Sequence, residues 1–214
     1  MKLYYNPLST YSQKVLIALY EKQVDCELVH VNLTTPEGRA EYEQVYPIGK
    51  VPLLNPGDDY MVPESTIIIE YLEGHYPTGT RLIPEGVDAA RQVRFMDRMS
   101  DLYLNNPCAT LLFERLGFSK HGEAELAQAG KYLRISYEQI DKRLANQDWL
   151  CGEFSMADCA AIPAFFYGQI VASYADYPNI VRYYERAQQR PSYARVRAEF
   201  VPIWDSMLSQ RAQA

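Results

Sequence analysis

The first thirty residues constrain the fold most, because they carry strand, helix and strand signals in quick succession. Lys2–Tyr5 is a short apolar segment of strand type, and Pro7 ends it. Apolar residues then recur at helical spacing, which predicts a helix over Thr10–Lys22. Glu27–Asn32 is predicted to be a second strand. Strands joined by a crossover helix pair in parallel, so the chain is predicted to begin with a β-α-β unit.

The next segments extend this unit to the order β-α-β-α-β-β-α. Thr34 to Glu37 is a helix-start pattern with Pro36 in the first turn. Asn55–Asp59 is rich in turn-forming residues and predicts a hairpin. Ser65 precedes an apolar run and is predicted to be the N-cap of the last helix. The expected elements are a helix at 36–45, strands at 51–54 and 60–62, and a helix at 66–72.

A cluster of glycine and proline residues then marks a change of domain. We expect an N-terminal α/β domain at residues 1–76, a linker at 77–87 and an all-helical domain at 88–214. The expected helices are 88–116 with a kink at Pro107, 123–146, 155–173, 177–189 and 192–200, before a frayed tail from Ser206. Ser155 and Asp158 have the spacing of a capping box, to which we assign a folding role.

Composition excludes several classes of function. The net charge is −6, so no basic surface for nucleic acid or a membrane is expected. No apolar run is long enough to span a bilayer, and the first residues do not form a signal peptide, so we expect a cytoplasmic protein. The three histidines are far apart and the four cysteines form no C-x-x-C pair, so we expect no metal site and reduced thiols.

Four hydroxyl residues, Ser9, Thr10, Tyr11 and Ser12, stand at the predicted start of the first helix. A helix start has unpaired N–H groups and a partial positive charge, which suit an anion such as a thiolate. An ordinary N-cap is the simpler interpretation of Ser9. A serine hydrolase or a phosphate-binding loop is excluded here, because neither G-x-S-x-G nor a glycine-rich turn is present.

Two further pairs allow a structural and a functional interpretation. Val51-Pro52 is most simply a trans proline at a strand edge, although a cis bond would leave the Val51 backbone free for an extended ligand. Glu64-Ser65 is most simply a helix cap, although together the two residues suit a group that carries both an ammonium and a carboxylate.

Taken in order, NPLSTYSQKVLIALYEK, YPIGKVPLL, PESTIIIEYL and FSMADCAAIPAF resemble the cytosolic glutathione transferase family over the whole chain. The closest resemblance is to serine-type members, similar to the phi, zeta and theta classes of plants and bacteria. The resemblance implies a thioredoxin-like N-terminal domain followed by an all-helical domain. It also implies a cis Pro52 and a glutathione site built from Lys50, Val51, Pro52, Glu64, Ser65 and Thr66.

The resemblance further implies a catalytic hydroxyl that activates the glutathione thiol. Ser9 holds the position of the serine classes, with Tyr11, Thr10 and Ser12 as alternatives. Tyrosines 4 and 5 lie in the first strand, so a tyrosine-type enzyme is not excluded. The implied activity is conjugation of glutathione to small hydrophobic electrophiles. The alternatives are a glutathione-dependent isomerase, dehalogenase or peroxidase, or a non-catalytic binding or interaction protein.

Glutathione is implied as a co-substrate, with no bound cofactor and no metal. The electrophile is expected in the helical domain near Tyr103, Asn106, Leu111 and Phe113. Asp97 and Asp101 lie four residues apart on one helix face and are expected to face solvent, with the site of a partner subunit as the alternative. The family usually forms two-fold dimers, so the implied partners are glutathione, an electrophile and a second copy of the chain, with no nucleic acid and no membrane.

Overall fold

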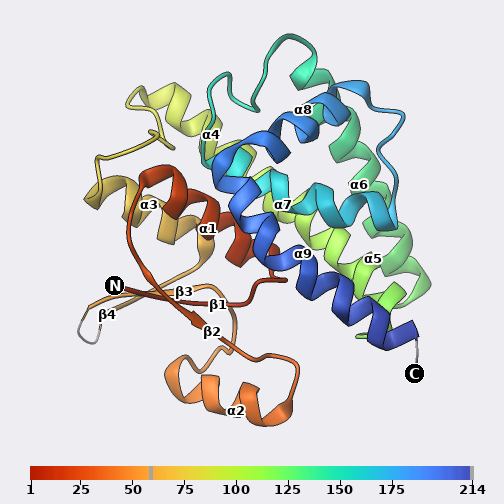
Figure 1. Ribbon diagram of the computed structural model, residues 1–214. Helices are drawn as coiled ribbons and strands as arrows, with labels where there is room; N and C mark the ends of the chain where they lie inside the picture. Colours follow the sequence, from red (N-terminus) through yellow and green to blue (C-terminus); the bar gives the residue numbers. More distant parts are fainter. Residues whose placement is uncertain (58–59, 213–214) are drawn as a thin grey trace. The chain divides into compact units, whose positions relative to one another are not determined.

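The computed structural model describes residues 1–57 and 60–212, whose contacts form two compact units (Figure 1). The first unit holds Met1–Arg81 together with the C-terminal helix α9 (Pro191–Ala212), and the second holds Leu82–Arg190. The boundary at Arg81 falls inside the expected linker. The assignment of α9 to the first unit differs from the expected grouping of residues 88–214.

The first unit is built on a four-stranded sheet in the order β2-β1-β3-β4. β1 (Lys2–Tyr5) pairs in parallel with β2 (Glu27–His30) and antiparallel with β3 (Leu53–Gly57), which pairs antiparallel with β4 (Tyr60–Pro63). The predicted parallel β-α-β unit is therefore confirmed. The predicted hairpin is also formed, with Gly57 opposite Tyr60, while Asp58 and Asp59 lie outside the described residues.

Three helices complete the predicted order. α1 (Thr10–Lys22) and α2 (Pro36–Val45) have the predicted bounds, and α3 (Ser65–His75) is longer than predicted. α1 and α3 contact each other above the sheet in Figure 1, and α2 lies below it. The Lys22 ammonium, itself buried, pairs with Glu73 of α3 at 3.1 Å. This sheet with its helices is the thioredoxin-like arrangement that the resemblance implied.

Helix α9 packs on α1, and it is longer than the sequence predicted. Its Ser192 hydroxyl donates to Glu21, and Arg195 lies 4.1 Å from the ring centre of Tyr20. We expected the helix to stop at residue 200 and the tail to fray from Ser206, but the helix continues to residue 212. The reason is a buried apolar face that continues past Pro202, from Phe200 to Trp204.

The second unit consists of helices, as predicted for this part of the chain. They are α4 (Val87–Met99), the π-helix η1 (Ser100–Asn105), α5 (Asn106–Leu116), α6 (Glu123–Arg143), the 3-10 turn η2 (Leu144–Asn146), α7 (Met156–Val171) and α8 (Pro178–Gln189). α7 is the central helix, because every residue from Met156 to Gly168 is buried. In the described ranges 1–57 and 60–212, no helix is both long and apolar enough to cross a membrane.

Where we expected a kink at Pro107, the structure has the π-helix η1, which ends two residues before that proline. Proline lacks an N–H group and crowds the carbonyl four residues earlier, which here belongs to Tyr103. The Ser136 hydroxyl of α6 donates to that carbonyl at 2.6 Å. A side chain from a neighbouring helix thus replaces the backbone donor that Pro107 lacks.

The predicted capping box of α7 is present, and its acid does more than cap one helix. Asp158 is fully buried, and its carboxylate accepts from the Ser155 N–H at 2.9 Å and from the Ser155 hydroxyl at 3.1 Å. It also accepts from the Leu150 N–H at 2.9 Å and from the Tyr183 hydroxyl of α8 at 3.0 Å. One carboxylate therefore joins the start of α7, the preceding loop and α8.

Burial raises the pKa of Asp158 to about 6, even though its hydrogen bonds favour the charged form. A raised pKa means that the stability contributed by the neutral form is fully present below about pH 4 and is lost as the pH rises through 6. We predict that the stability advantage of the wild type over Asp158→Asn shrinks by up to about 3 kcal/mol from well below pH 4 to well above pH 6, because one pKa unit is worth about 1.4 kcal/mol. Urea unfolding of both proteins across this pH range measures it.

The matched control is Asp176→Asn, which changes an exposed aspartate of the same unit. The difference in the free energy of unfolding between Asp176→Asn and wild type should stay constant with pH. If the stability advantage of wild type over Asp158→Asn is constant or grows with rising pH, the raised pKa of Asp158 is contradicted.

Candidate functional site

Ser9 is the N-cap of α1, and its geometry leaves its hydroxyl able to donate. Its backbone is extended, with φ −77° and ψ 119°, and its Oγ accepts from the Ser12 N–H at 3.3 Å. A hydroxyl that accepts such a bond keeps its own hydrogen for another acceptor. The Ser9 side chain is only half-buried, so capping and hydrogen bonding to a ligand are compatible.

The other three hydroxyls of the junction are in different environments. Thr10 and Tyr11 are half-buried, as Ser9 is. Ser12 is fully buried, and its Oγ accepts from the Asn6 N–H at 3.2 Å. The Ser12 hydroxyl therefore stabilises the loop from inside and is not accessible to a ligand.

The tyrosines of the first strand are engaged in packing. Tyr5 is buried, and its hydroxyl donates to Glu199 of α9. Burial, followed by the hydrogen bond and the charge of Glu199, raises the pKa of Tyr5 far above its usual value. The Tyr4 ring packs beside Tyr42 at 6.0 Å between centres. A phenol that is held this way and resists ionisation is a poor donor to an incoming thiol.

The Val51–Pro52 peptide bond is cis, as the resemblance implied. Val51 is half-buried and precedes β3, so it lies outside the hydrogen-bond ladder of the sheet. Lys50 is exposed, and its carbonyl accepts from the Tyr42 hydroxyl at 2.9 Å. Burial raises the pKa of Tyr42, so this hydroxyl keeps its proton and continues to donate. Tyr42 of α2 thus anchors the segment that precedes Pro52.

The start of α3 corrects one prediction. Ser65 was expected to be the N-cap, but it is the first helical residue, and Glu64 is the cap without a side-chain capping bond. Glu64 has φ 69° and ψ 120°, which is unusual for a residue other than glycine and costs about 1–3 kcal/mol. The Glu64 side chain is exposed, and Ser65 and Thr66 form the first turn of α3, where backbone N–H groups point out of the helix start.

A buried lysine links this turn to the junction at Ser9. Lys14 of α1 is 0% exposed, and its ammonium donates to the Thr66 hydroxyl at 2.8 Å. Lys14 lies five residues after Ser9, which is about 7.5 Å along a helix. The starts of α1 and α3, which are far apart in sequence, therefore lie close together.

Sequence reasoning did not identify Lys14, Tyr42 or Asn6 as residues of this region. A signal for Lys14 existed, because it is a charged residue directly before the apolar run 15–19 of α1. Asn6 stands between a strand and a proline, where an asparagine commonly bonds to nearby backbone.

The residues expected near an electrophile lie in the second unit, on η1 and α5. Tyr103 is partly exposed and meets Tyr132 edge-on at 5.2 Å, whereas Phe113 meets Phe118 at 5.9 Å. Asn106 is exposed and Leu111 is half-buried. Tyr103 and Phe113 thus have separate aromatic neighbours, and the shared role of the four residues stays a prediction.

The expectation that Asp97 and Asp101 face solvent is wrong. Asp97 is 0% exposed and Asp101 is 6% exposed. Both lie on helices α4 and η1, which pack against α7, and Asn105 of η1 donates to the Ala160 carbonyl of α7 at 2.9 Å. Their polar character suggested solvent, but their helical spacing places them with Asn105 on the packed side.

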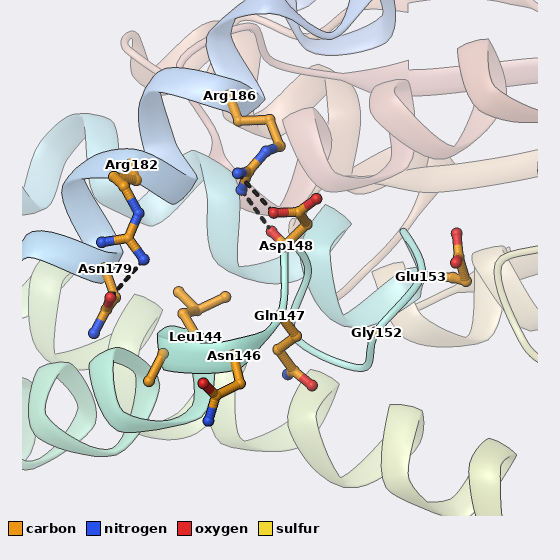
Figure 2. Close-up of a pocket in the computed structure, with 10 residues that line it drawn as sticks. Leu144, Asn146, Gln147, Asp148, Gly152, Glu153, Asn179, Arg182 and Arg186 are labelled. Atoms are coloured by element: carbon orange, nitrogen blue, oxygen red, sulfur yellow. Dashed lines mark hydrogen bonds and ion pairs between the residues drawn. The ribbon is translucent and has the colours of Figure 1, made fainter.

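A cavity of about 470 Å³ opens elsewhere in the second unit, and it contains none of the predicted residues (Figure 2). Its two arginines on α8 are held by neighbouring side chains: Arg186 pairs with Asp148 at 2.7 Å, and Arg182 donates to Asn179 at 2.6 Å. Because these polar groups are paired within the wall, we place the candidate site at the starts of α1 and α3.

Comparison with known proteins places both units in one family. The glutathione S-transferase N-terminal domain matches residues 3–81, and the glutathione S-transferase C-terminal domain matches residues 104–191. Glutathione S-transferase hmp2 of Hypomyces subiculosus is 28% identical, covering 93% of this chain and 98% of the relative. Glutathione S-transferase F6 of Arabidopsis thaliana is 31% identical, covering 78% of this chain and 83% of the relative.

The fold is similar to that of a crystal structure of a glutathione S-transferase from Methylobacillus flagellatus with glutathione bound. The TM-score is 0.80 at 27% identity, and the match covers 91% of this chain and 98% of that one.

The capping role of Ser9 can be tested apart from any catalysis. We predict that Ser9→Ala lowers the free energy of unfolding by about 1 kcal/mol, because the Ser12 N–H loses its acceptor. Ser9→Asp should keep wild-type stability, because aspartate caps well and suits a helix start. Urea unfolding measures both, and equal stability of Ser9→Ala and wild type would show that the cap contributes nothing.

Proposed function

Because this chain belongs to the glutathione S-transferase family, we propose that it activates the thiol of glutathione at Ser9 and conjugates glutathione to small hydrophobic electrophiles. The observation that carries the proposal is the half-buried Ser9 hydroxyl at the start of α1, which keeps its proton for a ligand. The nearby start of α3, joined through Lys14 and Thr66, supplies a place for the other end of the tripeptide.

In the proposed complex, each part of glutathione meets a matching group. The γ-glutamyl carboxylate accepts from the N–H groups of Ser65 and Thr66, and Glu64 takes the γ-glutamyl ammonium. The Val51 backbone pairs with the cysteinyl unit beside Pro52. The exposed Lys50 takes a glutathione carboxylate or carbonyl.

The proposed chemistry begins with the thiolate. A free thiol has a pKa of about 8.5, and a hydroxyl donor together with the partial positive charge of a helix start lowers it. The thiolate attacks an electrophilic carbon and forms a C–S bond. In a substitution the leaving group departs with its electron pair, and in an addition the new carbanion takes a proton from water.

The other nucleophile and donor candidates support the choice of Ser9. Ser12 is buried and Tyr5 is held by Glu199, so Thr10 and Tyr11 are the remaining alternatives. The cysteines are all free, but burial raises the pKa of Cys26 and Cys151 to about 11 and that of Cys108 to about 12. These groups stay thiols near neutral pH, which favours a reaction that uses the thiol of the substrate.

The remaining parts of the proposal follow from the family. Tyr103, Asn106, Leu111 and Phe113 are proposed to contact the electrophile, because they expose aromatic and apolar surface on η1 and α5. A cytoplasmic location is proposed because glutathione keeps thiols reduced there, and the cysteines of this chain are free. Two copies are proposed to form a homodimer.

The catalytic test uses calorimetry with glutathione and a conjugation assay with a reactive aryl chloride. We predict that Ser9→Ala binds glutathione but loses about 10²-fold in kcat/KM, the usual effect of removing one donor to a developing anion. Ser9→Thr, which keeps a hydroxyl, should retain much more activity. Tyr5→Phe is the control and should conjugate within threefold of wild type. A rate for Ser9→Ala equal to wild type would exclude Ser9 as the donor, and wild type that binds no glutathione would refute the function.

The assembly has its own test. We predict that light scattering coupled to gel filtration gives twice the mass of one chain at micromolar concentration. A mass that stays at one chain up to 100-fold higher concentration would contradict the dimer.

A further inference from the structure

We propose that Asn6 is the positioning residue of Ser9: it holds the loop between β1 and α1 so that the Ser9 hydroxyl points at the glutathione sulfur. This inference rests on the proposed function. Asn6 is half-buried at the end of β1, three residues before Ser9, and needs no contact with glutathione to act.

All four polar groups of Asn6 are used, and each bond leads to a different part of the site. The side-chain Nδ2 donates to the Val31 carbonyl at 3.0 Å, and Oδ1 accepts from the Leu8 N–H at 3.0 Å. The backbone N–H donates to Ser12 Oγ at 3.2 Å, and the backbone carbonyl accepts from the Ser9 N–H at 3.0 Å. One residue therefore joins the sheet, the loop, the N-cap and the first turn of α1.

The bond to Val31 gives the loop a rigid support. Val31 is 5% exposed and directly follows β2, and its own N–H donates to the Tyr5 carbonyl at 2.8 Å. On the other side of the loop, the buried Gln13 side chain donates to the Pro7 carbonyl at 2.7 Å. The segment from Asn6 to Ser9 is thus anchored to the sheet at one side and to α1 at the other.

Asparagine suits this position because a donor and an acceptor are needed on one short side chain. Alanine supplies neither. Aspartate keeps the acceptor for Leu8 but loses the donor to Val31 and adds a negative charge near the proposed thiolate. The role therefore predicts an order of effects that packing alone would not produce.

The expected effect is on thiol activation rather than on binding. A misplacement of about 1 Å can cost about 10²-fold in rate, so Asn6→Ala should lower kcat/KM by about 10–100-fold. The apparent thiol pKa in the pH profile of kcat/KM for the electrophile, measured at saturating glutathione, should rise toward the free value of about 8.5. The Kd for glutathione should change less than threefold, because Val51, Glu64 and Ser65 are untouched.

Two further variants sharpen the test. Asn6→Asp is nearly isosteric, should fold, and should raise the apparent thiol pKa at least as much as Asn6→Ala, because of its charge. Asn32→Ala is the matched control: Asn32 is exposed, and its Oδ1 accepts from the Thr34 N–H at 3.0 Å, a turn bond like that of Asn6 with Leu8. It should leave both the pH profile and the rate unchanged.

The outcomes separate the two proposals. If wild type binds and conjugates glutathione while folded Asn6→Ala or Asn6→Asp keeps the wild-type pH profile and rate, the Asn6 inference is overturned and the function stands. If wild type binds no glutathione by calorimetry, the proposed function fails, and the inference fails with it. A raised apparent thiol pKa with an unchanged Kd, absent in Asn32→Ala, supports the role of Asn6.

Discussion

The hydrogen bond from the Lys14 ammonium to Thr66 is the contact on which the candidate site depends. A fully buried ammonium lowers stability unless its N–H groups find acceptors. The hydrogen bond to Thr66 therefore fixes the position of both side chains. This bond joins two helix starts that are about 50 residues apart in sequence. Farther along the same helices, Lys22 and Glu73 make a second link at 3.1 Å. α1 and α3 are therefore fixed to each other at two points, which holds their first turns near each other.

Helix capping by a polar side chain recurs in both units and determines where a helix begins. In the first unit, Ser9 caps α1 while Asn6 and Ser12 bond across the loop that precedes it. In the second unit, Asp158 caps α7 and also binds Leu150 and Tyr183. The Asp158 group is buried completely and serves folding, whereas the Ser9 hydroxyl is half-buried and can still donate a hydrogen bond. Accessibility, rather than residue type, separates the structural cap from the candidate catalytic one.

Much of the fold follows from local patterns that a sequence reader can use. The bounds of β1, α1 and α2, the hairpin and the capping box were all predictable, because periodicity, proline positions and cap spacing act over a few residues. Errors arose where a distant partner decides the outcome. Asp97 and Asp101 look like surface residues but are buried in α4 and η1, which pack against α7. The C-terminal helix continues past Pro202 because Phe200 and Trp204 extend a buried face.

The candidate site shows the same division at the scale of single atoms. By itself the sequence determined that hydroxyls stand at the start of α1, that an acid and a serine stand at the start of α3, and that a proline precedes β3. Each of these is a matter of residue type and short spacing. Only the tertiary structure decided that Ser12 faces inward, that Tyr5 is taken by Glu199, and that Lys14 brings the two helix starts together. Burial and hydrogen bonding between segments distant in the chain set these outcomes, and no local pattern records them.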